Sequence, residues 1–375
     1  MHLRRATVHG MPEILTKRAL NRTLLHRQML LAREERSVAE TIDHLVGMQS
    51  QLPNAPFVGL WSRLASFDPK ELNGLMTSRA TVRTSLMRTT IHLVSAADAL
   101  ALRPLFQPVL ERTFRSQRAF REGIEGIDAD ELRRVGRELL EAEPMGGAEL
   151  GRRLAERWPD RDASAMAHAV RFWLPIVQVT PRGLWGRTMA PRMTTTEAWL
   201  GRGVEESGDA GALLLRYLRA FGPASVADMR TWSWLTGLRP VVEELRPRLR
   251  TFTDERGREL FDVPDAPILT GDEPAPARFL PEYDNIVLSH DDRSRITTTW
   301  PLDTTLTRGS LLVDGFVAGA WTVKRERRAA TLLIDAFRDL STAERAEVEE
   351  EADGLLAFMA AGVPERAVQL TRVGP

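Results

Sequence analysis

The chain has 375 residues, of which 43% are hydrophobic and 27% charged, and this is typical of a globular protein of two or three domains. It contains no cysteine, which excludes disulfides, a thiol nucleophile and a cysteine-ligated metal. No apolar stretch reaches the roughly 20 residues of a membrane-spanning helix and no secretory signal opens the chain, so we expect a cytoplasmic protein.

The formal net charge is zero, which at first argues against a nucleic-acid partner. The placement of positive charge matters more than its sum, however. Only three of the 51 basic residues are lysines (Lys17, Lys70 and Lys324), so 48 are arginines. GC-rich coding is the simpler explanation of this ratio. The alternative is that arginine forks bind phosphates and base edges.

The first third of the chain predicts helices followed by a strand pair. Apolar spacing and cap residues predict four helices, over 14–30, 37–48, 53–64 and 68–78. Residues 83–94 are β-branched and roughly alternating, so we expect a pair of strands there. Ser95 then caps a long helix that ends near Phe114.

This order of helices and hairpin occurs twice more. The second copy has predicted helices over 128–141, 148–157 and 162–173, and a hairpin over 176–187 with Gly183 at its turn. The third has predicted helices over 211–221, 226–234 and 239–249, and a hairpin over 249–263. Three short helices followed by a β-hairpin is the winged-helix order. We therefore expect three winged-helix modules, over residues 12–120, 125–195 and 208–264.

The last part of the chain, residues 277–375, is predicted to be a β-rich region. Residues 265–277 are rich in proline, glycine and acidic residues, and we interpret them as a linker. A β-meander follows over 311–335, and its second turn, residues 324–328, is strongly basic. Ser341 caps a final helix that reaches Met359. The expected fold class is α+β, mainly α.

Two glutamines, Gln49 and Gln51, flank Ser50 just before Pro53. If this segment is extended, the two amides point to the same side of the chain. Paired amides hold a water and a polar substrate by hydrogen bonds, although neither is a nucleophile or a titrating base. The triplet by itself is explained more simply as the polar end of a helix, so its interpretation depends on the rest of the chain.

Five motifs spread over nearly the whole chain resemble the bacterial winged-helix DNA glycosylases that unhook interstrand crosslinks, the AlkZ/YcaQ-like family. They lie at residues 46–51, 89–94, 279–285, 291–294 and 313–321. The resemblance implies three winged-helix modules in a concave, C-shaped, DNA-holding scaffold. It also implies a catalytic Q-Φ-Q triplet, here Gln49 and Gln51. Ser50 replaces the apolar middle residue, and because its side chain should point away from the active face we expect the replacement to be tolerated.

The function implied is a monofunctional glycosylase that hydrolyses the N-glycosidic bond of N7-alkylated purines in DNA, including bulky natural-product adducts or interstrand crosslinks. A second Gln, where a related branch has Asp, points to the AlkZ-like side, which is associated with repair and antibiotic self-resistance. An N7-alkylpurine is cationic and leaves without a general acid, so two amides suffice to hold a water near C1′ and to stabilise the sugar. Either amide could hold the water.

Lysine scarcity favours water over an amine nucleophile, because none of the three lysines lies near the triplet in sequence. The basic turn, with Lys324, Arg325, Arg327 and Arg328, is a candidate probe of the minor groove or phosphates, and a solvated hairpin tip is an equally good explanation. His92 is also a candidate DNA contact, although a core histidine is the more common case.

The partner expected is double-stranded DNA with alkylated purines, bound by a monomer associated with the nucleoid. We expect no cofactor, no metal and no membrane partner. The alternative function is a non-enzymatic winged-helix transcriptional regulator. Its recognition helix, over 162–173, would offer few base-reading side chains, and no long heptad pattern for dimerisation is present.

Overall fold

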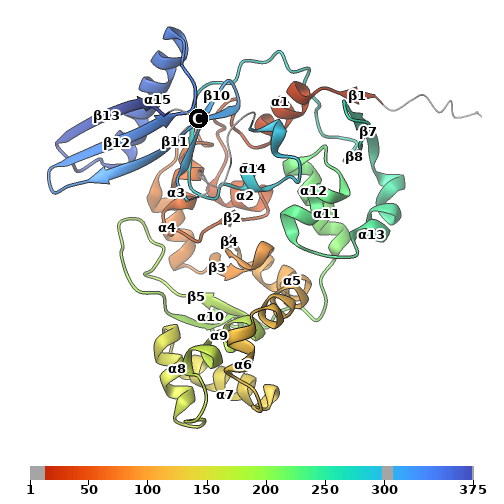
Figure 1. Cartoon of the computed structure of the whole chain (residues 1–375), viewed down its shortest axis with the longest axis vertical. Helices are drawn as coiled ribbons and strands as arrows, with labels where there is room; N and C mark the ends of the chain where they lie inside the picture. The colour runs from red at the N-terminus through yellow and green to blue at the C-terminus, as the bar shows by residue number, and fades with distance from the viewer. Residues whose placement is uncertain (1–12, 298–306, 374–375) are drawn as a thin grey trace, which may run out of the picture.

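The computed structural model describes residues 13–297 and 307–373, and it has an α+β fold with a C-terminal β-rich region, as expected (Figure 1). Residue 12 of the first predicted module, and residues 298–306 and 374–375 of the predicted C-terminal region, lie outside the described residues. In Figure 1 the second helical segment lies at the bottom, the third at the right and the C-terminal sheet at the upper left, around the N-terminal helices.

The first segment begins with β1 (Ile14–Leu15), so the prediction of a helix from residue 14 is wrong: Thr16 caps the helix, and the chain pairs with β7 ahead of it. The elements that follow are α1 (Lys17–Arg27), α2 (Val38–His44), β2 (Met48–Gln49), α3 (Ala55–Trp61), α4 (Pro69–Thr77), β3 (Thr81–Ser85), η1 (Met87–Thr89), β4 (Ile91–Ser95) and α5 (Ala96–Ser116). The predicted caps at Ser37 and Ser95 are both confirmed.

The second segment contains the three predicted helices but a different hairpin. Its elements are α6 (Arg118–Glu122), α7 (Ala129–Ala142), α8 (Gly147–Ala155), α9 (Ala163–Trp173), β5 (Ile176–Gln178), β6 (Met193–Thr195) and α10 (Thr196–Leu200). The return strand is β6, so the prediction of a hairpin over 176–187 is wrong. Residues in between form a long loop because Trp185 packs its ring 5.0 Å from Phe57 and 4.9 Å from Phe358 instead of joining the sheet.

The third segment matches its prediction closely. It comprises α11 (Ala210–Phe221), α12 (Val226–Ser233), α13 (Leu238–Leu245), η2 (Arg246–Arg248), β7 (Arg250–Asp254) and β8 (Glu259–Asp262), with the last two paired as a hairpin. Ser225 and Asp228 form a capping box that begins α12. Residues 265–277 contain no helix or strand, as expected of a linker.

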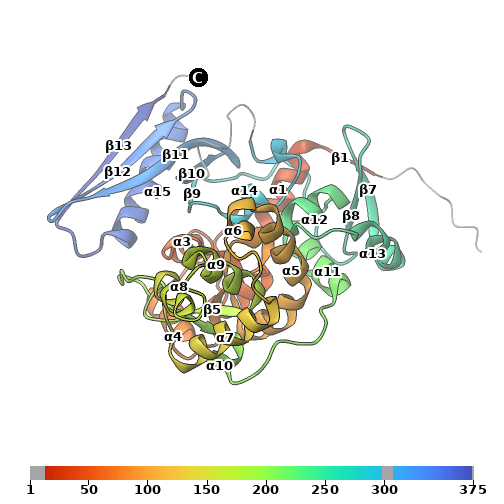
Figure 2. The same ribbon diagram turned by 60° about the horizontal axis from the view of Figure 1, so that its bottom comes forward.

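The C-terminal region is a five-stranded sheet covered by one helix. It contains β9 (Arg278–Leu280), α14 (Asn285–Leu288), η3 (Arg293–Arg295), β10 (Gly309–Val313), β11 (Phe316–Arg325), β12 (Ala329–Ala336), α15 (Thr342–Met359) and β13 (Glu365–Arg372). The meander and the helix capped by Ser341 are confirmed. The strands β9 and β13 were not predicted, and β13 runs parallel to β12. Figure 2 shows this sheet projecting from the helical body.

Strand pairing and packing link the segments to each other. A single sheet of order β2-β4-β3-β5-β6 joins the first and second segments. The first and third share a core that includes Phe106, Tyr217 and Trp232, and Leu280 and Leu312 of the C-terminal region join it. The second segment and the C-terminal region each have a further core. The module boundaries therefore stay a prediction. None of the helices in the described ranges is long and apolar enough to cross a membrane.

Candidate active site

The Q-x-Q segment lies in the short edge strand β2 and its extension. Left-handed backbone at Val46 and Gly47 turns the chain out of α2 into β2, and a Cβ on Gly47 would lie 2.4 Å from Val94 Cγ1. Gln49 pairs with His92 of β4, and the Ser50 N–H donates to the Ile91 carbonyl at 2.7 Å. The chain is therefore in a strand at Gln49, as the paired-amide hypothesis requires, but β2 ends there and Gln51 lies in the bend that follows.

Ser50 points to the opposite face from Gln49. Its hydroxyl accepts a hydrogen bond from Arg83 Nε at 2.9 Å, and its carbonyl accepts one from Arg83 Nη2 at 2.6 Å. Both side chains are buried. The Arg83 guanidinium thus holds the backbone between the two glutamines from the face opposite Gln49. It also gives the polar side chain in the middle of the triplet, Ser50, a hydrogen-bond partner.

Gln49 is nearly buried, with 7% of its surface exposed, and its Oε1 accepts a hydrogen bond from Arg88 Nη2 at 2.8 Å. The other terminal nitrogen of Arg88 donates to the Trp232 carbonyl at 2.6 Å. Trp232 lies in the last turn of α12, where carbonyls lack intrahelical partners. Arg88 therefore bridges the candidate catalytic strand and the third segment.

Arg88 combines a left-handed backbone with a buried positive charge that has no ion-pair partner among the described residues. Its φ of +54° and that of Thr89, +57°, are left-handed, which costs a side-chain-bearing residue roughly 1–2 kcal/mol. Burial, and secondly the charge of Arg293, lower the pKa of Arg88 to about 10, so it stays protonated at neutral pH. No carboxylate in the described part of the chain forms an ion pair with it.

His92 lies next to Arg88 and Gln49 and is fully buried. Its Nδ1 is 3.0 Å from the Thr90 carbonyl and its Nε2 is 3.4 Å from Arg88 Nη2. Burial, and then the Arg88 charge, lower the pKa of His92 to about 3, so the ring is neutral. These contacts are those of a core histidine, and the buried ring has no surface with which to touch DNA in this structure.

Gln51 is held much more loosely. Its side chain is exposed, and its Oε1 accepts one long hydrogen bond, from the Ile91 N–H at 3.3 Å. The two amides therefore differ: Gln49 has a charged partner and a fixed orientation, whereas Gln51 faces solvent with its amide nitrogen free of any described partner.

Residues 279–285, another of the five motifs, form the wall behind Gln49. Asp284 accepts two hydrogen bonds from the buried Arg63 fork, at 2.8 and 2.9 Å, and Asn285 Nδ2 donates to the Gly47 carbonyl at 2.7 Å. A cavity of about 10 Å³ lies between this wall and Gln49. The fold thus brings the motifs at 46–51, 89–94 and 279–285 together at one place.

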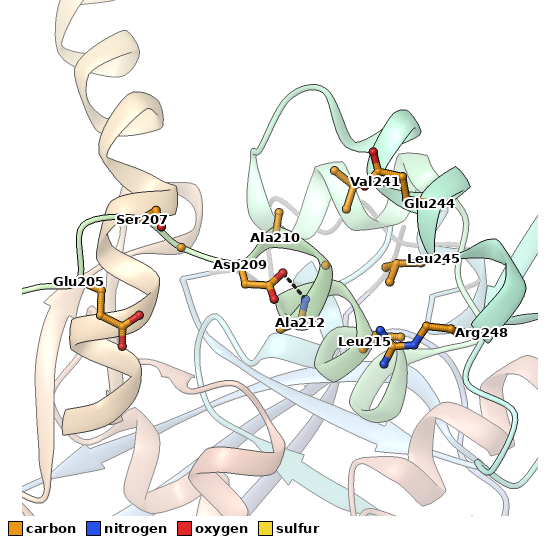
Figure 3. Close-up of a pocket in the computed structure, with 12 residues that line it drawn as sticks. Glu205, Ser207, Asp209, Ala210, Ala212, Leu215, Val241, Glu244, Leu245 and Arg248 are labelled. Carbon is orange, nitrogen blue, oxygen red and sulfur yellow. Dashed lines mark hydrogen bonds between the residues drawn. The ribbon is translucent and has the colours of Figure 1, made fainter.

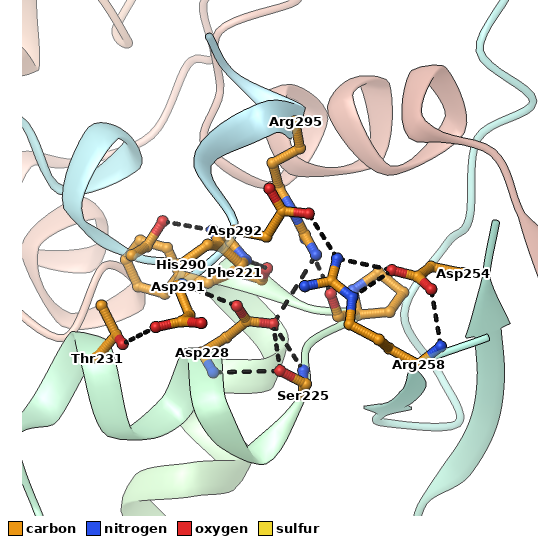
Figure 4. Close-up of polar contacts among 12 residues, drawn as sticks. Phe221, Ser225, Asp228, Thr231, Asp254, Arg258, His290, Asp291, Asp292 and Arg295 are labelled. Atoms are coloured by element: carbon orange, nitrogen blue, oxygen red, sulfur yellow. Dashed lines mark hydrogen bonds and ion pairs between the residues drawn. The ribbon is translucent and has the colours of Figure 1, made fainter. Parts of the chain in front are cut away.

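A buried charge network anchors α12 to the motif at 291–294 (Figure 4). Asp228 of α12 accepts from the Asp291 N–H at 2.9 Å, and Asp292 pairs with Arg258 at 2.7 Å. His290 is buried beside them, and burial lowers its pKa to about 3. Since Asp228 and Trp232 share a helix, this network also fixes the carbonyl that holds Arg88.

The basic turn, residues 324–328, lies on the C-terminal sheet and is not part of the wall that residues 279–285 form behind Gln49. Lys324 is 66% exposed and pairs with Glu326 at 3.0 Å, while the Arg325 guanidinium donates to the Met359 carbonyl. Arg327 and Arg328 are exposed, and neither has an ion-pair partner within the ranges that the structure describes. A cavity of about 400 Å³, lined by Leu52 beside Gln51 and by Arg325, joins the two regions.

Other features of the described residues lie away from these side chains. A cavity of about 790 Å³ lies between residues 205–209, α11 and α13, and contains none of the candidate residues (Figure 3). Its charged lining residues are Glu205, Asp209 and Glu244, with Arg248 as the one arginine in its lining. Its acidic lining does not suit DNA phosphates. No group of three or more metal-binding side chains occurs in the described ranges.

No local pattern in the sequence indicates the roles of Arg83 and Arg88. Both lie in the segment predicted as a strand pair, and both are ordinary arginines in a chain with 48 of them. Their importance depends on a carbonyl 144 residues away and on the Ser50 backbone across the sheet. Only the folded chain makes these contacts visible.

Comparison with known proteins gives consistent results. A family model described as DNA glycosylase AlkZ-like matches residues 42–358. An "Interstrand DNA cross-link repair glycosylase" of Streptomyces sahachiroi is 23% identical over 359 residues, which is 88% of this chain and 92% of the relative. The solved structure of Streptomyces sahachiroi DNA glycosylase AlkZ is similar in fold, with a TM-score of 0.71 and 19% identity over 96% of this chain and 100% of that one.

Proposed function

This chain belongs to the AlkZ-like family of DNA glycosylases, and we propose that it is a monofunctional enzyme for N7-alkylated purines in double-stranded DNA. We extend the proposal to bulky adducts and interstrand crosslinks, because the curated relative that it resembles is named for crosslink repair. The observation that carries the proposal is the pair of non-titrating amides, Gln49 at the end of β2 and Gln51 in the bend that follows, both bonded along β4.

The chemistry needs no acid and no covalent intermediate. An alkyl group on N7 leaves the purine cationic, so breaking the C1′–N9 bond returns the bonding electrons to the ring and releases a neutral base. Water adds to C1′ and passes its proton to the solvent. The amides have to position that water and the sugar–phosphate backbone before the bond breaks, which lowers the barrier by orientation and by fixed dipoles.

The positions of the lysines support water as the nucleophile. Lys324 is on the exposed hairpin, Lys70 begins α4 on the surface, and Lys17 lies over the Phe316 ring. None of them contacts Gln49 or Gln51 in the described structure. An amine that forms a Schiff base must reach C1′ itself, and the distance of these three amines from the two glutamines supports water instead.

We assign the DNA-holding role to the basic turn, residues 324–328, which is the tip of the hairpin between β11 and β12 (the basic hairpin tip). Arg327 and Arg328 have no described partner to neutralise them, so they are available for phosphates. We propose that Lys324 and Arg325 contribute through the same surface and that the protein acts as a monomer.

The proposal is tested by incubating the purified protein with duplexes that carry one defined N7-alkylguanine, from N7-methylguanine to an adduct with a bulky aromatic group. We expect abasic sites at the damaged position only, an intact strand before alkali, and no protein–DNA adduct after borohydride. Undamaged duplex is the control. Binding without any abasic product would favour the transcriptional regulator, and a trapped adduct would show that an amine nucleophile operates.

A further inference from the structure

Arg88 decides which way the Gln49 amide faces. A guanidinium has only donors, so the Gln49 atom 2.8 Å from it must be the carbonyl oxygen. The amide NH2 is then turned away from Arg88. A rotated amide would place two sets of N–H donors against each other in a buried site, which is strongly unfavourable.

Both terminal nitrogens of Arg88 are used on carbonyl oxygens, one on Gln49 and one on Trp232. This has an electrostatic consequence, since the transition state of base excision carries positive charge on the sugar. A guanidinium aimed at that sugar would oppose the reaction. Directed at Gln49 Oε1 instead, its charge polarises the amide and strengthens the opposite N–H groups as donors.

We infer, on the basis of the proposed function, that Arg88 is a positioning residue that makes Gln49 a hydrogen-bond donor to the phosphodiester beside the reacting sugar. Gln51 is then left to accept a hydrogen bond from the attacking water, whose proton passes to the solvent. Phosphate is the fitting acceptor for Gln49, because a donor on the ring oxygen O4′ would work against the charge that develops there. Gln51 is the fitting water ligand, because its Oε1 has only one long hydrogen bond and a second lone pair to offer.

Other features of Arg88 agree with a positioning role. Its left-handed backbone, together with that of Thr89, is a strained conformation that folds maintain mainly where function requires it. The Trp232 carbonyl that holds it belongs to a helix end fixed by the Asp228 network. Orientation of Gln49 thus depends on the docking of the third segment against the first.

The test is a double-mutant cycle on single-turnover excision, with Arg88→Met, Gln49→Ala and the double variant. We expect Arg88→Met to slow excision by about 10- to 100-fold, less than the roughly 10²–10³ for outright loss of a preorganised donor because the Gln49 N–H groups remain, while affinity for undamaged duplex is retained. In the Gln49→Ala background Arg88→Met should have almost no further effect, because its action passes through Gln49. Arg88→Lys should restore part of the rate, since it keeps one donor.

Arg103→Met is the matched control for folding. Arg103 is likewise buried, with a pKa lowered to about 10 by burial, and it donates to the Leu174 carbonyl at 2.9 Å, remote from Gln49. We expect a comparable fall in melting temperature and an unchanged excision rate of the folded protein. Equal slowing by Arg88→Met in both backgrounds would overturn the inference alone. No excision by the wild-type protein would contradict the proposed function and the inference with it.

Discussion

The Q-x-Q strand and the basic hairpin tip are constructed in opposite ways. Gln49 is 7% exposed and fixed by a buried arginine, whereas Lys324 is 66% exposed and its neighbours Arg327 and Arg328 face solvent. A group that orients a water or a sugar at a reacting centre has to be in place before the reaction begins. A cation that attracts phosphate works through its charge and tolerates mobility.

The difference predicts that mutations in the two regions separate rate from affinity. Changes around Gln49 should alter excision with little change in DNA binding. Changes in the hairpin tip should alter binding to damaged and undamaged DNA alike.

The largest effect is expected from Gln49→Glu. A carboxylate keeps the acceptor for Arg88, gains an ion pair and loses both N–H donors. We expect excision to fall by about 10²–10³ with an equal or higher melting temperature. Gln51→Glu keeps a water acceptor and should lose far less. Equal rates for the two variants in a single-turnover assay would show that the glutamines are not differentiated.

The second effect concerns binding. Reversing the charge at Arg325, Arg327 and Arg328 together should weaken binding to damaged and undamaged duplex and reduce the log–log salt slope by about three, one for each lost phosphate contact. Excision at saturating enzyme should survive. The measurement is a fluorescence-anisotropy salt titration. An unchanged slope would mean that the tip is only solvated and that DNA is held by another surface.

Sequence reasoning found the exposed region more readily than the buried one. A run of cations on a predicted turn is visible without a structure, and so are Ser37, Ser95 and Ser341 as helix caps, because all are local patterns. The orientation of Gln49 depends on Arg88 and Trp232, 144 residues apart, and has no local signal.

The errors in the predicted fold have the same origin. β13 was missed because its alternation is weak and mostly polar, and it forms only as an edge strand beside β12. The return strand of the second hairpin was misplaced because the aromatic packing of Trp185 lies in tertiary structure. The longer helices, by contrast, follow from spacing and caps, with differences of a few residues at their ends. The short helices α6, α10 and α14 are not predicted from the sequence.

A smaller effect is a loss of stability in mild acid that originates in the buried region. Four histidines have a lowered pKa, namely His44, His92, His168 and His290. For His92 the folded value of about 3 lies below the ordinary 6.5, so the unfolded chain binds a proton that the folded chain does not. Stability is therefore complete above roughly pH 6.5 and is lost as the pH falls towards 3, by up to about 1.4 kcal/mol per unit and site.

Melting temperatures between roughly pH 7.5 and 5 test this, because most carboxylates stay ionised there. His92→Gln should make the decrease shallower, since it removes one of the groups that must stay neutral. A variant with the same pH dependence as the wild-type protein would indicate that His92 is solvated and the core beneath Gln49 open.

The central claim is that Gln49 and Gln51 carry out base excision together. Its most direct test is the single-turnover rate of Gln49→Ala and Gln51→Ala on a duplex with one N7-alkylguanine that the wild-type protein processes, measured beside their affinity for the undamaged duplex. We expect each variant to lose about 10²–10³ in rate and to keep its DNA affinity. Wild-type excision rates in both variants would contradict it.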